Sequence, residues 1–213
     1  MRFAERNRCG VALVALITCV AGCATPVQPT TTSTPAVTKA QMVRAPVSPA
    51  AHRVFDDARR ALKAGRWRDA ERGFLALTRS NPELGGPHAN LGIIYREHGK
   101  LDDAVAELER AVRVSPDQPV YYNQLGIAYR QQGQFRKART AYEEAIDLDP
   151  NYAAACLNLG ILSDLYLWDT RRALEMYDRY LVLAGADDRV SKWIVDIKNR
   201  NVRHSMLSRK ELE

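Results

Sequence analysis

The pattern of apolar and polar positions repeats every 34 residues through the middle of the chain. Matched positions keep their residue, or its size and polarity. The pairs are Leu91 and Leu125, Gly92 and Gly126, Tyr95 and Tyr129, Gly99 and Gly133, Ala104 and Ala138, Leu108 and Tyr142, Ala111 and Ala145, and Pro116 and Pro150. A period of this length, with small, aromatic and proline positions in this order, predicts an array of helix pairs.

Glycines and prolines predict where these helices meet and where they end. One glycine in each copy would let the two helices of a pair approach closely, at a cost of about 1 kcal/mol relative to alanine. These glycines are Gly92, Gly126 and Gly160. Gly99 and Gly133 are expected to end first helices in the left-handed conformation. The prolines expected to stop the second helices are Pro82, Pro116 and Pro150.

Four copies of the pattern can be placed, at residues 51–84, 85–118, 119–152 and 153–186. The first copy is degenerate, since Asp57 and Ala61 replace the leucine and the tyrosine. The fourth keeps the sequence Asn158-Leu159-Gly160 but has one extra residue after Gly160. Terminal copies are expected to be atypical, because one side of each meets water instead of a neighbour.

The order Leu-Gly-x-x-Tyr, Gly, Ala, aromatic or Leu, Ala and Pro resembles the tetratricopeptide repeat over about Ala51 to Ala186. The resemblance implies an all-α fold. In that family helix–turn–helix units form a right-handed superhelix, whose concave wall is built from the first helix of each unit.

An apolar stripe at residues 187–203 predicts a further helix that caps the last repeat. Asp187 and Asp188 suit its N-terminus. The chain is expected to fray beyond Asn199 and to end in a polar tail at residues 204–213. A helix lying on a membrane surface is the alternative interpretation, because Trp193 and the neighbouring basic residues would suit one.

Residues 1–22 have the pattern of an export signal, with basic residues before an apolar run at 11–20. The run is too short to span a bilayer comfortably. It closes with Val20-Ala21-Gly22-Cys23, which resembles the lipobox of bacterial lipoproteins. The resemblance implies cleavage before Cys23 and acylation of its sulfur and amino group. Because Ala24 follows instead of aspartate, it also implies the periplasmic face of the outer membrane. An ordinary secretory signal with a chance cysteine is the alternative.

Residues 23–50 are predicted to be a tether between this lipid and the repeats. The segment is rich in Thr, Pro, Ser, Val and Ala and has almost no charge. It cannot bury enough apolar area to offset the entropy of ordering. About 25 residues at up to roughly 3 Å each would let the folded part stand tens of ångströms from the membrane.

Composition narrows the chemistry further. After signal cleavage Cys156 is the one cysteine besides Cys23, so no intramolecular disulfide is expected, and a small buried residue is the simplest role for it. The net charge of +6 would fall to +4, spread thinly without a long run of like charges, which argues against a nucleic-acid partner. No metal-ligand spacing, phosphate loop or catalytic triad is present. We therefore expect no metal, no cofactor, no small-molecule substrate and no enzymatic activity.

Residues that the repeat pattern does not require predict a binding groove along the first helices. An aliphatic stripe flanked by guanidinium and amide groups suits a partner peptide with apolar and acidic side chains. The candidate groove residues are Asn90, Ile93, Arg96, Asn123, Gln124, Ile127, Arg130, Asn158 and Ile161. Asp164 takes the arginine's place in the last copy. Alternatively, the isoleucines pack against neighbouring first helices and the polar groups are simply solvated. The clamp with which some family members grip a C-terminal carboxylate is not evident.

These features predict a non-enzymatic adaptor, tethered to the outer membrane by lipid and binding envelope proteins or peptide segments in the periplasm. Small repeat lipoproteins of this kind resemble accessory proteins of type IV or Flp pilus assembly. Others resemble scaffolds that recruit cell-wall hydrolases, or proteins found with TonB–ExbB–ExbD systems. A regulator that binds peptidoglycan or a peptidoglycan-active enzyme is the main alternative, and a cryptic enzyme is a further one.

Overall fold

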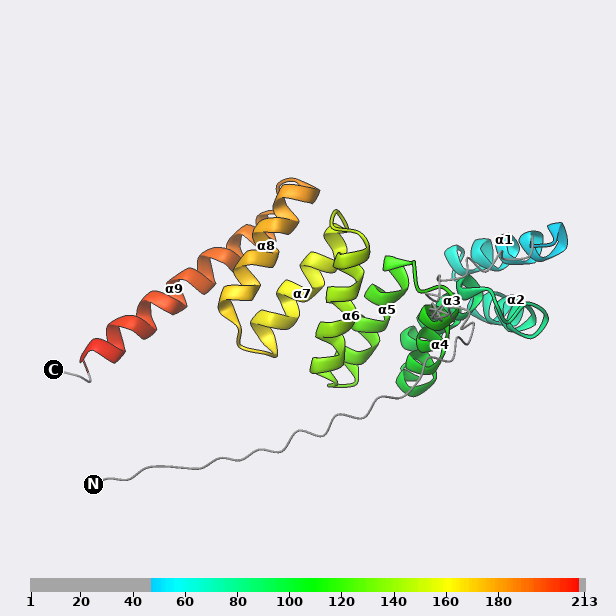
Figure 1. The fold of residues 1–213 in the computed structure, drawn as a ribbon, viewed down its shortest axis with the longest axis horizontal. Coiled ribbons are helices and arrows are strands. Elements are labelled where there is room, and N and C mark those ends of the chain that lie inside the picture. Colours follow the sequence, from blue (N-terminus) through cyan, green and yellow to red (C-terminus); the bar gives the residue numbers. More distant parts are fainter. Residues whose placement is uncertain (1–46, 211–213) are drawn as a thin grey trace, which may run out of the picture. The chain divides into compact units, whose positions relative to one another are not determined.

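Residues 47–210 are described by a computed structural model of the chain, and within them the secondary structure consists of nine α-helices (Figure 1). The helices are α1 (Pro49–Lys63), α2 (Trp67–Ser80), α3 (Gly85–Glu97), α4 (Leu101–Val114), α5 (Pro119–Gln131), α6 (Phe135–Leu148), α7 (Ala153–Leu165), α8 (Thr170–Ala184) and α9 (Asp188–Lys210). They belong to one compact unit, Ala45–Glu213. The predicted signal, Cys23 and most of the predicted tether lie outside the described residues.

The first eight helices form four hairpins that follow one another in chain order (Figure 1). Within each hairpin the first helix packs on the second, as in α3 on α4 and α5 on α6. The second helix of each hairpin then contacts the first helix of the next, and α8 contacts α9. The predicted all-α array of helix pairs is confirmed.

Close approach within each hairpin depends on glycine. A Cβ atom added at Gly126 would lie 2.5 Å from Cε1 of Tyr142, and one at Gly92 would lie 2.5 Å from Cγ of Leu108. Such distances are too short for carbon atoms, so these positions must stay small. The predicted packing role of these glycines is confirmed.

In the first hairpin the small residue that permits close approach lies on the second helix. Ala58 stands on α1 where the other first helices carry glycine, and Gly73 on α2 faces it. A Cβ at Gly73 would lie 2.8 Å from Cβ of Ala58. The degenerate copy therefore exchanges which helix carries the small residue and keeps the contact.

Turns within the hairpins require a left-handed residue. Gly99 and Gly133 have φ of +74° and +75°, which confirms their predicted role. The fourth turn, Tyr166–Asp169, contains four residues where the other three contain three, so the extra residue of the last copy lies here. It has no glycine, and Trp168 takes the left-handed conformation with φ of 56°.

Ring contacts join successive hairpins next to these turns. The rings of Trp67 on α2 and His98 after α3 have centroids 5.4 Å apart and meet edge to face. The rings of Phe135 on α6 and Tyr166 after α7 are 4.6 Å apart. Both pairs place the start of a second helix against the end of the next first helix, which fixes the spacing of the hairpins.

Helix α9 caps the stack with its first half. Val190, Ile194 and Ile197 are buried in one cluster with Ala173 and Tyr177 of α8. Asp187 accepts hydrogen bonds from the backbone N–H groups of Arg189 and Val190, as predicted for an N-cap. Val190, Ile194 and Ile197 are therefore not available to a membrane surface, whereas Trp193 is exposed. Within residues 47–210, no helix combines the length and the apolar character that crossing a bilayer requires.

The two ends of the folded region differ from their predicted limits. Helix α1 begins at Pro49, inside the predicted tether, because the Ser48 hydroxyl accepts the backbone N–H of Ala51 and proline suits the first helical turn. Helix α9 continues to Lys210, past residue 203, where the capping helix was predicted to end. No proline or glycine interrupts the chain after Gly185, and Arg200 pairs with Asp196 one turn earlier.

Candidate partner-binding face

The candidate face is formed by the first helices of the last three hairpins. Helix α3 contacts α5, and α5 contacts α7, so equivalent side chains on these helices follow one another along the array. The predicted groove residues lie on these three helices. Their contacts differ strongly from one helix to the next, and those differences decide which of them a partner could reach.

Arg96 of α3 and Gln124 of α5 are in contact, as expected for side chains on the same face of neighbouring first helices. Nη1 of Arg96 donates to Oε1 of Gln124 at 2.9 Å, and Nη2 lies 2.7 Å from Oε1 of Glu97. The Arg96 side chain is 12% exposed, and its Nε has no hydrogen-bond partner among the described residues. Arg96 is therefore a mostly buried cation with one unused donor.

Arg130 occupies the equivalent position on α5 and is half-buried. Among the described residues, no carboxylate lies within ion-pair distance of its guanidinium, and no side-chain hydrogen bond of Arg130 is formed. Its charge acts on the hydroxyls of Tyr142 and Tyr177 instead, opposing the rise that burial causes in the pKa of each. A guanidinium without an anion is thus present at the centre of the array.

Asp164 occupies on α7 the position of Arg96 and Arg130, and α9 covers it. Oδ1 of Asp164 accepts a 2.6 Å hydrogen bond from Nη2 of Arg200, and the Asp164 side chain is 7% exposed. This partner was missed in the sequence because Arg200 lies outside the repeat, in the stretch predicted to fray. The last hairpin therefore offers no open charge at this position.

The predicted groove asparagines form hydrogen bonds within the protein. Asn123 is buried, accepts a 2.9 Å hydrogen bond from Nδ2 of Asn158, and donates to the Tyr152 hydroxyl at 3.3 Å. Asn90 donates to the Gly86 carbonyl on its own helix at 2.8 Å. Asn123 and Asn158 thus tie α5 to α7, and we do not place them on an open binding surface.

The three isoleucines have different surroundings, and all are half-buried. Ile161 packs against the cluster that α9 shares with α8, and Ile127 packs against the central core. Ile93 belongs to none of the buried clusters of the described residues. The packing alternative therefore holds for Ile161 and partly for Ile127.

What remains open is a smaller surface on α3 and α5. It consists of Ile93, Arg96, Gln124, Ile127 and Arg130, and we call it the α3–α5 patch. Beneath it the Tyr142 hydroxyl is buried without a hydrogen-bond partner in the described region, and burial raises the pKa of Tyr142 to about 12. The patch presents one free guanidinium beside aliphatic side chains.

A groove on another surface had no sequence signal. Tyr122, Leu125 and Tyr129 of α5 form its floor and α6 flanks it, enclosing about 360 Å³. The Tyr129 hydroxyl donates to Glu109 of α4 at 2.6 Å, so its polar atom is already used. Leu125 and Tyr129 are repeat positions, so the sequence pattern marked them as scaffold.

The two histidines of the second hairpin each have a polar partner. Nδ1 of His88 lies 2.6 Å from Oε2 of Glu107, and Nδ1 of His98 lies 2.7 Å from the Ile94 carbonyl. Cys156 is fully buried. Within the described residues, no group of three His, Cys, Asp or Glu side chains is placed to hold a metal ion.

Comparisons with known proteins agree with this architecture. Residues 87–151, the second and third hairpins, match the family model described as "Tetratricopeptide repeat". No curated protein sequence matches the chain. Among solved structures, Pseudomonas aeruginosa pilF aligns with a TM-score of 0.66 and 19% identity, covering 73% of this chain and 71% of that one.

Two further solved structures share the fold. MamA aligns with a TM-score of 0.64 and 21% identity over 74% of this chain and 86% of that one. YrrB, described as "a TPR protein with an unusual peptide-binding site", aligns with a TM-score of 0.59 and 21% identity over 69% of this chain and 75% of that one. The described region thus has the all-α tetratricopeptide-repeat fold, and residues 87–151 match the model of that family.

Proposed function

We propose that the chain is a non-enzymatic adaptor of the bacterial envelope. Lipid on Cys23 holds it to the outer membrane, residues 24–48 give it reach into the periplasm, and the α3–α5 patch binds a segment of a partner protein. The anchor is supported by Val20-Ala21-Gly22-Cys23 after the apolar run at 11–20. Partner binding is supported by the repeat fold and by the patch.

The observation that carries the binding site is the state of Arg130. Its two counterparts along the row are occupied, Arg96 by Gln124 and Glu97, and Asp164 by Arg200. Arg130 alone of the three has no such partner in the described part of the chain. A partner carboxylate could accept two parallel hydrogen bonds from this guanidinium.

The surroundings of Arg130 define the segment that would fit. Ile93 and Ile127 offer aliphatic surface on neighbouring helices, and Gln124 offers an amide between them. A strand or helix with an apolar side chain beside an acidic one would satisfy both features. The partner is thus an apolar–acidic peptide segment and not a free C-terminus, since Asn123 and Ala89 of the clamp position are buried.

The process we favour is assembly of an envelope complex of the type IV or Flp pilus kind. The resemblance of the whole arrangement, lipid followed by tether and repeats, to accessory proteins of those systems supports it. The likeness to pilF is one of fold, and is compatible with the proposal. Binding of the purified repeat unit to cell-wall sacculi alone would favour the peptidoglycan alternative instead.

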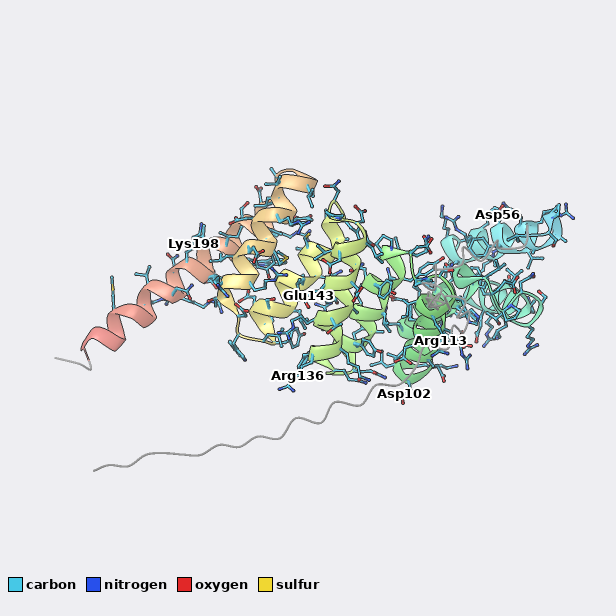
Figure 2. The ribbon with its side chains drawn as sticks, in the orientation of Figure 1. Asp56, Asp102, Arg113, Arg136, Glu143 and Lys198 are labelled. Carbon is cyan, nitrogen blue, oxygen red and sulfur yellow. The ribbon has the colours of Figure 1, made fainter. Side chains whose placement is uncertain are left out.

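Affinity capture from solubilised envelope tests the binding site. The variant Ile127→Glu, Arg130→Glu should lose partners that the unchanged protein recovers. The double variant Val120→Glu, Arg113→Glu makes the same chemical changes at exposed positions on α5 and α4, and should retain them (Figure 2). Recovery of the same partners by all three proteins rules the patch out.

Membrane fractionation tests the anchor. Cys23→Ala should move the protein from the membrane pellet to the soluble fraction when the wash contains about 1 M salt, which shortens electrostatic screening to about 3 Å. A variant that still pellets under these conditions contradicts lipidation at Cys23.

A further inference from the structure

The positive charge of the folded region lies in its first hairpin and in α9, where seven Lys and Arg stand against two Asp and Glu. Residues 49–80 contain eight Lys and Arg against four Asp and Glu, whereas residues 81–184 contain eleven against fifteen. The first hairpin thus has a formal charge of +4 and the next three together −4. The excess charge therefore differs from element to element, although the sequence contains no long run of like charges.

All eight of these cations are exposed. Three of them, Arg68, Arg72 and Arg79, share one face of α2, where they surround Leu75 and Ala76. We call Arg68, Arg72, Leu75 and Arg79 the α2 stripe. Its side chains enclose a shallow hollow of about 360 Å³, so the guanidinium groups border an apolar floor.

Carboxylates of the chain leave most of this charge unbalanced. Arg72 pairs with Asp69, but no carboxylate among the described residues lies within ion-pair distance of Arg68 or Arg79. Glu71 also lines the hollow, and after burial its charge is the next cause that raises the pKa of Tyr95 on α3. Two of the three arginines of the stripe, Arg68 and Arg79, therefore have no ion-pair partner among the described residues.

We propose that the α2 stripe binds the phosphate headgroups of an anionic lipid bilayer. Guanidinium groups match phosphate oxygens in a two-pronged geometry, and the aliphatic floor suits the region just below the headgroups. The choice of lipid over an acidic protein rests on position in the chain, and so on the proposed anchor. With Cys23 in the membrane, the first hairpin is the folded element joined directly to the tether.

Charge and the position of the tether together give this contact a direction. An anionic surface attracts the first hairpin and α9 and repels the three hairpins between them. Because the tether joins the first hairpin, the protein would meet the membrane with α2. The lipid anchor keeps the protein at the membrane, and the stripe orients it there.

Vesicle flotation tests the proposal without the anchor, using the compact unit Ala45–Glu213, which has its own hydrophobic clusters and lacks Cys23. It should float with vesicles of phosphatidylglycerol and phosphatidylcholine but not with phosphatidylcholine alone. Since each basic residue near such a surface contributes about fivefold in affinity, reversing three should weaken partitioning about a hundredfold or more. The variant is Arg68→Glu, Arg72→Glu, Arg79→Glu.

A matched variant separates the stripe from net charge. Arg136→Glu, Lys137→Glu, Arg139→Glu makes the same change in charge at three exposed positions on α6 and should bind nearly as well as the unchanged unit (Figure 2). The neutral variant Arg68→Gln, Arg72→Gln, Arg79→Gln should show an intermediate loss. Circular dichroism checks that each variant remains helical.

Several results would overturn the proposal. They are absence of flotation with anionic vesicles, equal flotation with neutral ones, and equal weakening by the α2 and α6 variants. Stripe-dependent binding of a poly-glutamate peptide without vesicle binding would assign the stripe to an acidic protein. Failure here leaves the Cys23→Ala fractionation unaffected, because the salt wash in that experiment removes electrostatic binding. A lost anchor likewise leaves the flotation result intact.

Discussion

The Arg200 guanidinium of α9 lies 2.6 Å from the Asp164 carboxylate of α7, across 36 positions of sequence. Asp164 is the position at which the two preceding first helices carry arginine. Exchange of Arg for Asp in the last copy thus provides the contact that seats the capping helix. Tyr177 and Trp193, with ring centroids 5.6 Å apart, support the same junction.

Removing Arg200 should weaken this junction. In Arg200→Ala the Asp164 carboxylate, 7% exposed, loses its charged partner, and we expect a loss of about 2 kcal/mol in the free energy of unfolding. The figure is moderated because Arg200 itself is 32% exposed. Urea denaturation measures it. Lys198→Ala, at an exposed position on the same helix, is the control, and equal effects would contradict the role of the pair (Figure 2).

Filling the space at Gly126 should destabilise the protein although alanine favours helix. A Cβ there would lie 2.5 Å from Cε1 and 2.6 Å from Cδ1 of Tyr142, a ring held between the helices. We expect Gly126→Ala to cost about 2 kcal/mol, since overpacking outweighs a gain of about 1 kcal/mol in helix propensity. Thermal unfolding checks this. Gln131→Ala, exposed at the end of the same helix, should have little effect, and a stabilised Gly126→Ala protein would refute the packing role.

The repeat itself could be predicted because each of its defining positions acts locally. Gly126 contacts a residue of its own hairpin, and Gly133 adopts a positive φ in the turn of that hairpin. Both requirements recur at a fixed spacing in the sequence, so the spacing predicts them. Contacts outside the period are different. Neither the Arg200–Asp164 pair nor the exchange of Ala58 with Gly73 follows from spacing, because each depends on which helix faces which in three dimensions.

The candidate site was predictable only in part for the same reason. The pattern placed Arg96 and Gln124 on one face, and the structure joins them. It could not distinguish Asn123, which is buried between α5 and α7, from open neighbours, because both occupy first-helix positions between the scaffold residues. Exposure depends on the next hairpin, and a single copy of the repeat does not encode it.

Replacing Trp168 with glycine should stabilise the fourth turn. Trp168 has φ of 56°, a conformation that strains a bulky residue, and it is 76% exposed, so little packing would be lost. We expect Trp168→Gly to raise the free energy of unfolding by about 1 kcal/mol. Differential scanning calorimetry measures the change. Trp168→Ala keeps the strain and serves as the control, and a gain of the same size there would point away from backbone strain.

Removing the Tyr142 hydroxyl should cost nothing. The oxygen is buried with no hydrogen-bond partner in the described region, and a buried polar group without a partner is unfavourable. Tyr142→Phe should therefore be neutral or stabilising by up to about 1 kcal/mol. In contrast, Tyr129→Phe should lose about 1–2 kcal/mol, because the Tyr129 hydroxyl donates to Glu109 at 2.6 Å. Denaturant titration compares them, and a clear loss in Tyr142→Phe would imply a partner for that hydroxyl.

Stability should fall on acidification through Glu107, whose side chain is 13% exposed. Burial alone would raise the pKa of Glu107, but the hydrogen bond from His88 and the charge of Arg110 outweigh it and hold the pKa below its ordinary value. The unfolded chain thus binds a proton at a higher pH than the folded one. The stabilisation is complete above the ordinary glutamate range, about pH 4.3, and is lost as the pH falls through the folded pKa.

The comparison of Glu107→Gln with the unchanged protein measures this contribution. At about pH 6 the variant should be less stable, because glutamine cannot form the ion pair with Arg110, and at about pH 3 the difference should shrink as the native carboxylate gains a proton. Urea unfolding at both pH values gives the two differences. Glu144→Gln, at an exposed position on α6 with no ion pair among the described residues, should show no comparable change. A Glu107→Gln difference that stays constant or grows toward pH 3 would contradict the direction of the shift.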